Sequence, residues 1–172
     1  KFFDFLSENN IKRIIFPSSG GTVYGEMTDK LNSLSKNTLP ISFYGAHKLL
    51  IENYLRIYFH EKKLIPIILR ISNPYGPNQS NYKKQGFIGT AIKSIIEHNE
   101  IDVWGDGSVV RDYIHIDDLS ELLLKCLDVN ESCMFNVGSG IGLSIIDILE
   151  EIKFINKKDF KINYLESSDY DV

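Results

Sequence analysis

Apolar residues gather in short runs separated by polar turns, and two of these runs are typical of strands buried on both faces. The runs cover residues 13–16 and 64–71. Strands of a parallel sheet are covered on both faces, so they appear as near-continuous apolar runs without alternation. Pro17 follows the first run directly, and we expect it to end that strand.

The spacing of apolar positions elsewhere predicts helices and shorter strands. Helices are expected over 2–8, 43–61, 86–98, 117–127 and 144–155, with Asp117 as the cap of the fourth. Shorter strands are expected over 101–104, 111–116, 134–137 and 161–165. Residues 111–116 alternate polar with apolar positions, which is typical of an edge strand. Surface loops are expected over 26–40, 73–77 and 78–85.

The order of these elements predicts an α/β fold. The two buried strands are joined by a long helix, and such a βαβ crossover is right-handed almost without exception. The turn after the first strand, the start of the helix and the loop after the second strand should therefore gather at one rim of the sheet. Ligands bind at the carboxyl ends of strands in open α/β sheets.

The start of the long helix carries a pair of residues with chemical potential. Tyr44 and Lys48 are four residues apart, so they share one helix face. A cation beside a phenol favours the phenolate and lowers a pKa that is ordinarily about 10, which makes a phenol usable as a base. The pair also occurs by chance in many helices, so its surroundings decide its meaning.

Composition excludes several classes of partner. The chain of 172 residues has 19 basic and 23 acidic side chains and a net charge of −4, which favours neither nucleic acid nor an anionic membrane. No apolar run has the roughly 20 residues that a membrane span needs, so a cytoplasmic protein is expected. Cys126 and Cys133 have no metal-ligand companions in the sequence and predict buried or partly buried thiols in a reducing compartment.

Five motifs occur in an order that resembles one enzyme family. They are Ser-Ser-Gly-Gly-Thr-Val-Tyr-Gly at 18–25, Tyr-x-x-x-Lys at 44–48, Arg-Ile-Ser-Asn-Pro-Tyr-Gly-Pro at 70–77, Gly-Asp-Gly at 105–107 with Arg-Asp-Tyr-Ile-His-Ile-Asp-Asp at 111–118, and Phe-Asn-Val-Gly-Ser-Gly at 135–140. This pattern resembles the extended short-chain dehydrogenase/reductase family, and most closely its nucleotide-sugar epimerases of the UDP-glucose 4-epimerase type.

The resemblance implies a cofactor and a reaction. NAD would lie across the sheet, and Tyr44 would remove the proton of a sugar 4-hydroxyl while hydride passes to the nicotinamide. Lys48 would also bond the cofactor ribose, with Ser18 and Pro74 as further cofactor contacts. The family's serine or threonine that bonds the reacting hydroxyl falls on Gly20 by spacing. We therefore expect Ser19 in that role, with Thr22 as the reserve and a purely turn-forming hydroxyl as the alternative.

The resemblance also implies residues for a nucleotide-diphosphate sugar. The residue that matches Asn73 contacts the sugar or a phosphate, and Arg111 matches an arginine that grips the diphosphate, unless Arg111 forms a salt bridge with a nearby acid. Phe87, Ile88 and Trp104 would wall the nucleotide pocket, although such residues are as often plain core. Asp117, Asp118 and Asn136 are expected to be structural, and no metal site is expected.

The resemblance predicts that this chain is a C-terminal fragment. It places residues 1–78 in the second half of a Rossmann-like NAD-binding domain, and residues 79–172 mainly in a small α/β substrate-binding region, with some elements returning to the sheet. The family's Gly-rich first turn has no counterpart here, so we expect the fragment to bind NAD weakly and to be inactive alone. Ser168 stands where the family commonly has another phosphate-binding arginine. A second face of the Tyr44 helix would be covered by a partner subunit or by the chain itself.

Other activities are compatible with the same motifs. A 4,6-dehydratase usually has an Asp-Glu pair after the threonine of the first loop, whereas Gly20 and Gly21 lie near that place here. Decarboxylases and 4-reductases of nucleotide sugars are further alternatives. A module that only binds a sugar nucleotide belongs to a different class, and the intact Tyr44 and Lys48 pair argues against it.

Overall fold

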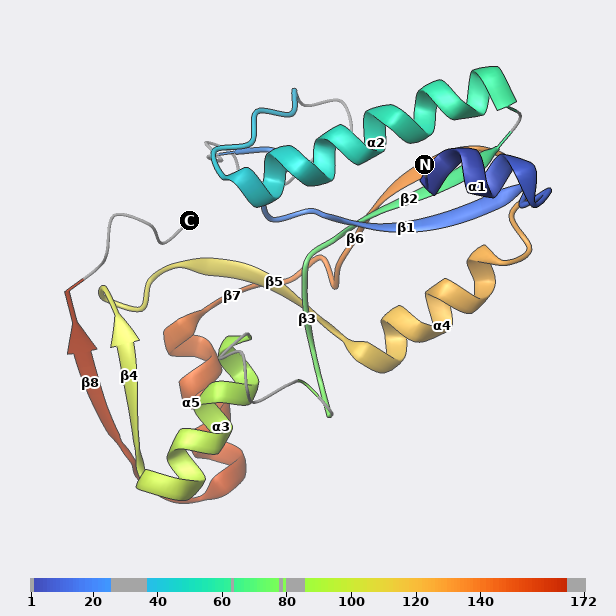
Figure 1. The fold of residues 1–172 in the computed structure, drawn as a ribbon. Helices are drawn as coiled ribbons and strands as arrows, with labels where there is room; N and C mark the ends of the chain where they lie inside the picture. The colour runs from blue at the N-terminus through green and yellow to red at the C-terminus, as the bar shows by residue number, and fades with distance from the viewer. Residues whose placement is uncertain (1, 26–36, 63, 78, 80–85, 167–172) are drawn as a thin grey trace. The chain divides into compact units, whose positions relative to one another are not determined.

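The computed structural model describes residues 2–25, 37–62, 64–77, 79 and 86–166 (Figure 1). The chain divides into two compact units. Unit 1 comprises Lys1–Ser72 and Asp118–Val137, and unit 2 comprises Asn73–Asp117 and Gly138–Val172. Each unit has its own sheet.

Unit 1 is built on a parallel sheet of three strands. Its strands β1 (Arg13–Ser19), β2 (Ile65–Ile71) and β6 (Cys133–Val137) lie in the order β1-β2-β6. The long helix α2 (Phe43–Lys62) joins β1 to its parallel neighbour β2, so the predicted βαβ crossover is confirmed. Figure 1 shows α1 (Phe2–Glu8) and α2 on one side of the sheet and α4 (Ile116–Cys126) on the other.

The core of unit 1 lies between the sheet and the two helices α1 and α2. Four buried side chains form its centre, with Ile14 and Phe16 of β1 packed against them: Leu6, Leu55, Leu64 and Ile68. Burial of each such side chain contributes about 1.5–3 kcal/mol. On the outer face of α2, by contrast, Leu50, Tyr54 and Ile57 remain about half exposed.

Pro17 does not end β1, which continues to Ser19, and the prediction was wrong at this point. Lys12 O accepts from Ile65 N at 2.8 Å and Gly20 N donates to Ile71 O at 2.7 Å, so the even-numbered positions of β1 face β2. The nitrogen of Pro17 therefore faces away from β2. Because β1 has only this one strand neighbour among the described residues, the missing N–H breaks no ladder bond.

Unit 2 combines a mixed sheet, a strand pair and two helices. Strand β5 (Val110–His115) lies between β3 (Asn73–Tyr75), which is parallel to it, and β7 (Gly142–Ser144), which is antiparallel. Strands β4 (Glu100–Trp104) and β8 (Lys161–Leu165) form a parallel pair. Helices α3 (Phe87–His98) and α5 (Ile145–Asn156) pack with β4 around one hydrophobic core. Its buried residues are Ala91, Ile95, Ile101, Val103 and Leu149.

Two predictions for unit 2 need correction. Residues 73–77 were expected to be a loop, but Asn73–Tyr75 form β3, because Asn73 Nδ2 donates to Asp112 O at 2.9 Å and ties this segment to β5. Strand β5 is flanked on both sides and is not an edge strand, because β3 and the equally unpredicted β7 both pair with it.

The helix ends explain two further boundaries. Helix α4 begins at Ile116, so Asp117 lies in its first turn and is not the predicted cap. Instead, Nδ1 of His115 accepts from the Asp117 N–H at 3.3 Å. Helix α5 has a capping box: Ser144 Oγ accepts from Asp147 N at 3.0 Å and Asp147 Oδ2 accepts from Ser144 N at 2.7 Å. Bonding to Ser144 lowers the pKa of the Asp147 carboxyl.

Several expectations lie partly or wholly outside the described residues. Most of the predicted loops 26–40 and 78–85, and Ser168, belong to that part of the chain. None of the helices in the described ranges combines the length and apolar character that a membrane crossing requires. Cys126 is buried and Cys133 half-buried, both as free thiols, and burial raises the pKa of each.

We predict that Gly45→Ala destabilises unit 1. A Cβ at position 45 would lie 2.4 Å from the Thr22 carbonyl oxygen and 3.0 Å from Pro40 Cβ, so either α2 or the turn after β1 must move. Overpacking of this kind costs about 1–3 kcal/mol, measurable by urea denaturation. Gly21→Ala is the matched control, because a Cβ there meets no atom within 4 Å. Equal stability of the two variants would contradict the close approach.

Candidate functional site

The first candidate group lies at the start of α2 in unit 1. Ser42 caps this helix: its Oγ accepts from Gly45 N at 3.1 Å and its carbonyl accepts from Ala46 N at 2.9 Å. This start places Tyr44 in the first turn, where its side chain is 58% exposed. An exposed phenol at a helix start is accessible to a ligand and is not part of the core.

Lys48 is held beside Tyr44 by the backbone of β1. Its Nζ donates to Pro17 O at 2.7 Å, and lies 5.5 Å from the centroid of the Tyr44 ring and 5.1 Å from that of Phe16. Pro17 O is available because this residue faces away from β2. The ammonium has three N–H donors, so besides Pro17 O it can bind oxygen acceptors such as ribose hydroxyls. Tyr44 and Lys48 thus share one face at the end of β1, as their spacing predicts.

The hydroxyl residues after β1 differ in their surroundings. Ser18, the predicted cofactor contact, is buried and its Oγ donates to Glu52 Oε1 at 2.5 Å. Ser19 is the last residue of β1, not part of the glycine turn, and strand alternation places it on the face opposite Ser18. Thr22 packs its carbonyl against Gly45 of α2, and its buried Oγ1 has no hydrogen-bond partner among the described residues. Thr22 therefore lies beside the start of α2, the helix that carries Tyr44.

A buried ion pair fastens α2 to the sheet of unit 1. Glu52 is fully buried and Arg70 is 3% exposed; Arg70 Nη2 donates to Glu52 Oε2 at 2.7 Å and Nε donates to Oε1 at 3.1 Å. Arg70 Nη1 donates to the Tyr24 hydroxyl at 2.9 Å, and that hydroxyl donates to Asn136 Oδ1 at 2.6 Å. Burial lowers the pKa of Arg70, but the bonds to Glu52 and Tyr24 outweigh this, so the net shift is upward and the guanidinium stays charged.

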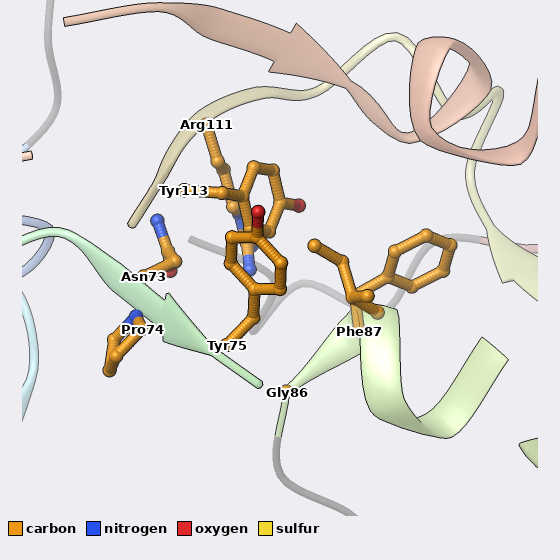
Figure 2. A pocket seen from close by; sticks show the side chains of 8 residues that line it. Asn73, Pro74, Tyr75, Gly86, Phe87, Arg111 and Tyr113 are labelled. Atoms are coloured by element: carbon orange, nitrogen blue, oxygen red, sulfur yellow. The ribbon is translucent and has the colours of Figure 1, made fainter. Parts of the chain in front are cut away.

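The second candidate group is a cavity of about 120 Å³ in unit 2. Its lining comes from β3, from β5 and from the start of α3 (Figure 2). Its lining is Asn73, Pro74, Tyr75, Gly86, Phe87, Ile88, Arg111 and Tyr113. Ligand pockets are commonly 300–1,000 Å³, so this cavity accommodates only part of a large ligand. We call it the Arg111 cavity.

Tyr113 gives the Arg111 cavity an unusual polar group. Its side chain is only 9% exposed, and its hydroxyl has no hydrogen-bond partner among the described residues. Burial raises the pKa of Tyr113, while the nearby charge of Arg111 lowers it, and burial prevails. A neutral phenol whose hydroxyl has no partner within the described part of the chain is a hydrogen-bond donor suited to an anionic ligand beside a guanidinium.

Asp112 holds a neighbouring turn against β5. Its carboxylate accepts from Ser139 N at 2.8 Å, from Gly140 N at 2.7 Å and from Ser139 Oγ at 3.1 Å. Gly138 fits this arrangement because a Cβ there would lie 2.6 Å from Asp112 Oδ2. Asp112 thus holds the turn with Ser139 and Gly140 against β5, at the position next to Arg111.

The structure brings together some of the predicted binding residues and separates others. Asn73, Phe87, Ile88 and Arg111 all line the Arg111 cavity, together with Pro74, which was predicted to border the nicotinamide. Trp104 does not line it: this side chain is 53% exposed on β4, because β4 alternates buried and exposed positions. In the described ranges no three His, Cys, Asp or Glu side chains are grouped as a metal site would need.

Sequence reasoning missed several polar residues. Glu52 and Arg70 are charged positions inside apolar segments, and such positions signal a buried pair. Tyr113 is an inward position of the alternating 111–116 segment, which identifies it as a lining residue. Tyr75 carried no comparable signal, because its place in the cavity depends on β3.

Comparison with known proteins gives consistent matches. The profile of the "NAD dependent epimerase/dehydratase family" matches residues 1–138. The dTDP-4-dehydro-6-deoxyglucose reductase of Escherichia coli is 41% identical over 159 residues, which cover 91% of this chain and 50% of the reductase. The UDP-glucose 4-epimerase of Yersinia enterocolitica is 30% identical, over 95% of this chain and 54% of the epimerase.

A solved structure also matches. The UDP-glucose 4-epimerase of Thermotoga maritima, determined with UDP-glucose, superposes with a TM-score of 0.94 at 30% identity, covering 99% of this chain and 55% of the epimerase. This match confirms the predicted α/β fold with a Rossmann-like parallel sheet. The chain spans about half the length of the curated relatives it matches.

We predict that Tyr113→Phe leaves stability unchanged or raises it. An unsatisfied buried hydroxyl is unfavourable, so its removal should raise the free energy of unfolding by up to about 1 kcal/mol. Urea denaturation of the full-length protein measures this, with the exposed Tyr164→Phe as a control that should have no effect. A clear loss of stability in Tyr113→Phe would reveal a partner for this hydroxyl inside the protein.

Proposed function

The chain belongs to the NAD dependent epimerase/dehydratase family, and from this premise we propose that the whole protein epimerises C4 of a nucleotide-diphosphate hexose. A UDP-sugar is the proposed substrate, because the epimerases of Yersinia enterocolitica and Thermotoga maritima are named for UDP-glucose. The observation that carries the proposal is the exposed Tyr44 with Lys48 anchored beside its ring.

The residues of unit 1 fit a bound NAD. Lys48 has N–H donors left for ribose hydroxyls, and the exposed Tyr44 lies at the carboxyl end of β1, where α/β sheets bind ligands. When bound, NAD accepts a hydride from a sugar carbon and returns it. Tyr44 and Lys48 would hold it in unit 1.

Tyr44 and Thr22 carry the proton chemistry in this proposal. Tyr44 Oη removes the proton of the sugar 4-hydroxyl as the hydrogen on C4 leaves with its electron pair, which gives a 4-keto sugar. Thr22 Oγ1, buried and without a partner among the described residues, hydrogen-bonds the reacting oxygen. After the keto sugar has turned and NAD, when bound, has given the hydride back, Tyr44 would return the proton to the sugar oxygen.

The Arg111 cavity recognises the diphosphate in this proposal. A guanidinium forms paired hydrogen bonds with phosphate oxygens, and the Tyr113 hydroxyl adds a neutral donor beside it. Asn73 already donates to Asp112 O, which leaves its amide oxygen for a sugar or ribose hydroxyl. Phe87 and Ile88 contribute apolar lining. Trp104 is not included, because it lies outside the cavity lining.

Reduction of a 4-keto sugar is the second candidate function. The Escherichia coli reductase is 41% identical to this chain, against 30% for the Yersinia epimerase. A reductase uses half of the epimerase cycle: hydride is delivered to C4 of a keto sugar and Tyr44 donates the proton. The same residues therefore serve both reactions, and only the fate of the keto sugar differs.

An assay of the full-length protein decides between these functions. We expect UDP-glucose or UDP-N-acetylglucosamine to change its C4 configuration, followed by NMR, with no net consumption of reduced cofactor. Oxidation of one equivalent of reduced cofactor per dTDP-4-dehydro-6-deoxyglucose, without epimerisation of any UDP-hexose, would establish the reductase. Inactivity in both assays with the sugar nucleotide still bound would support a non-catalytic module and refute the proposal.

Three substitutions test the assigned roles. Tyr44→Phe should lower kcat by about 10²–10⁴-fold with folding retained, because the proton acceptor is lost. Tyr54→Phe on the same helix is the matched control. Thr22→Val should lower kcat more than Ser19→Ala, and the reverse order would return the role of hydroxyl partner to Ser19.

We also propose a homodimer through α2. Leu50, Tyr54 and Ile57 follow a helical spacing of four and three residues and are about half exposed, which forms an apolar stripe on this helix. Leu50→Lys with Ile57→Lys should convert a dimer to a monomer in analytical ultracentrifugation. Ile141→Lys, at an exposed apolar position in unit 2, is the control. A monomeric parent protein would refute this interface.

A further inference from the structure

We propose that Glu52 and Arg70 are positioning residues, which hold Tyr44 and Lys48 where the reaction needs them. This inference rests on the proposed function. Glu52 follows Lys48 by one helical turn and Tyr44 by two, so all three lie on the same face of α2. Glu52 is fully buried, whereas Tyr44 is exposed, so the carboxylate is the internal end of this face and the phenol its external end.

The contacts of Glu52 restrict both rotation and sliding of α2. Its two oxygens receive Nε and Nη2 of Arg70 from β2, and Ser18 Oγ from β1 donates to Oε1. Paired hydrogen bonds to a planar guanidinium fix direction as well as distance. Because these partners lie on two different strands, they specify one position of α2 on the sheet.

The positions of Tyr44 and Lys48 depend on how α2 packs on the sheet. Lys48 Nζ donates to Pro17 O, and that bond forms only if α2 lies at the right height above β1. The apolar contacts of α2, such as those of Leu55, are not directional and tolerate small shifts. The ion pair supplies the missing directional restraint.

Arg70 extends the same restraint to the turn that carries Thr22. Its Nη1 donates to the Tyr24 hydroxyl, the guanidinium lies 4.9 Å from the Tyr24 ring centroid, and Tyr24 in turn donates to Asn136. Tyr24 follows Thr22 by two residues. One cation thus ties both the helix with Tyr44 and Lys48 and the turn with Thr22 to the same sheet.

Stability alone is a weak reason for such a pair. A buried ion pair replaced by apolar side chains of similar volume is often as stable or more stable, although removal of one partner alone is strongly destabilising. A variant that lacks both charges and keeps its stability therefore separates positioning from folding. Such a variant leaves Tyr44, Lys48 and Thr22 in the sequence.

The experiment uses a full-length double variant that carries both Glu52→Met and Arg70→Met. This double variant is compared with the parent protein and with the single variant Glu61→Met. Glu61 is an exposed carboxylate of the same helix, so its change controls for lost charge on α2. We expect urea denaturation of the double variant near that of the parent, kcat lower by about 10²-fold and KM for the sugar nucleotide unchanged, because a displacement of about 1 Å costs that much rate. A crystal structure should show Lys48 Nζ no longer on Pro17 O.

Unchanged kcat together with an intact Lys48–Pro17 bond in the double variant would overturn the inference. If the parent protein is inactive in both assays, the proposed function fails, and the crystal structure still decides whether the pair positions Lys48. If the double variant does not fold, Glu52→Gln takes its place. This isosteric change keeps an acceptor for Ser18 but weakens the bond to Arg70, and we expect about a tenfold loss of kcat with KM unchanged; full activity would count against the inference.

Discussion

The buried carboxylate of Glu52 restricts how the helix and the strands of unit 1 can pack. A charge without water is costly unless it is paired and fully hydrogen-bonded, and Glu52 meets this requirement only with Arg70 and Ser18 around it. Those partners belong to β2 and β1, so α2 has to pack over both strands in one register. The polarity of the core thus specifies an arrangement that apolar side chains alone leave open.

Much of the fold follows from the sequence, and the failures have physical causes. The runs 64–71 and 134–137 and the periodic positions of the helices depend on local pattern, and they match β2, β6 and the observed helices closely. Pro17, β3 and β7 depend instead on which strand lies beside which. A proline predicts the end of a strand unless its nitrogen is known to face away from the neighbouring strand, here β2. The three-residue strands β3 and β7 form only because each pairs with β5.

The candidate site shows the same division. The spacing of Tyr44 and Lys48 on a helix is a local property, so their common face could be predicted. The choice between Ser19 and Thr22 could not, because it depends on where β1 ends and on the contact of the turn with Gly45. Trp104 was expected to wall the pocket with Phe87 and Ile88, but the alternation of β4 leaves its side chain exposed and it does not line the Arg111 cavity. The alternation of residues 111–116 marks Tyr113 as an inward position, but only the structure shows that its hydroxyl has no hydrogen-bond partner among the described residues.

Gly20 and Gly21 are neighbours in sequence but offer very different room. A Cβ at position 20 would lie 2.9 Å from the Arg70 carbonyl oxygen, whereas a Cβ at position 21 meets nothing within 4 Å. Only the second position can accept a new side chain without displacing the backbone of β2. Of these two positions, residue 21 is therefore the one at which an extra acid or base could be introduced by design to change the chemistry at this rim.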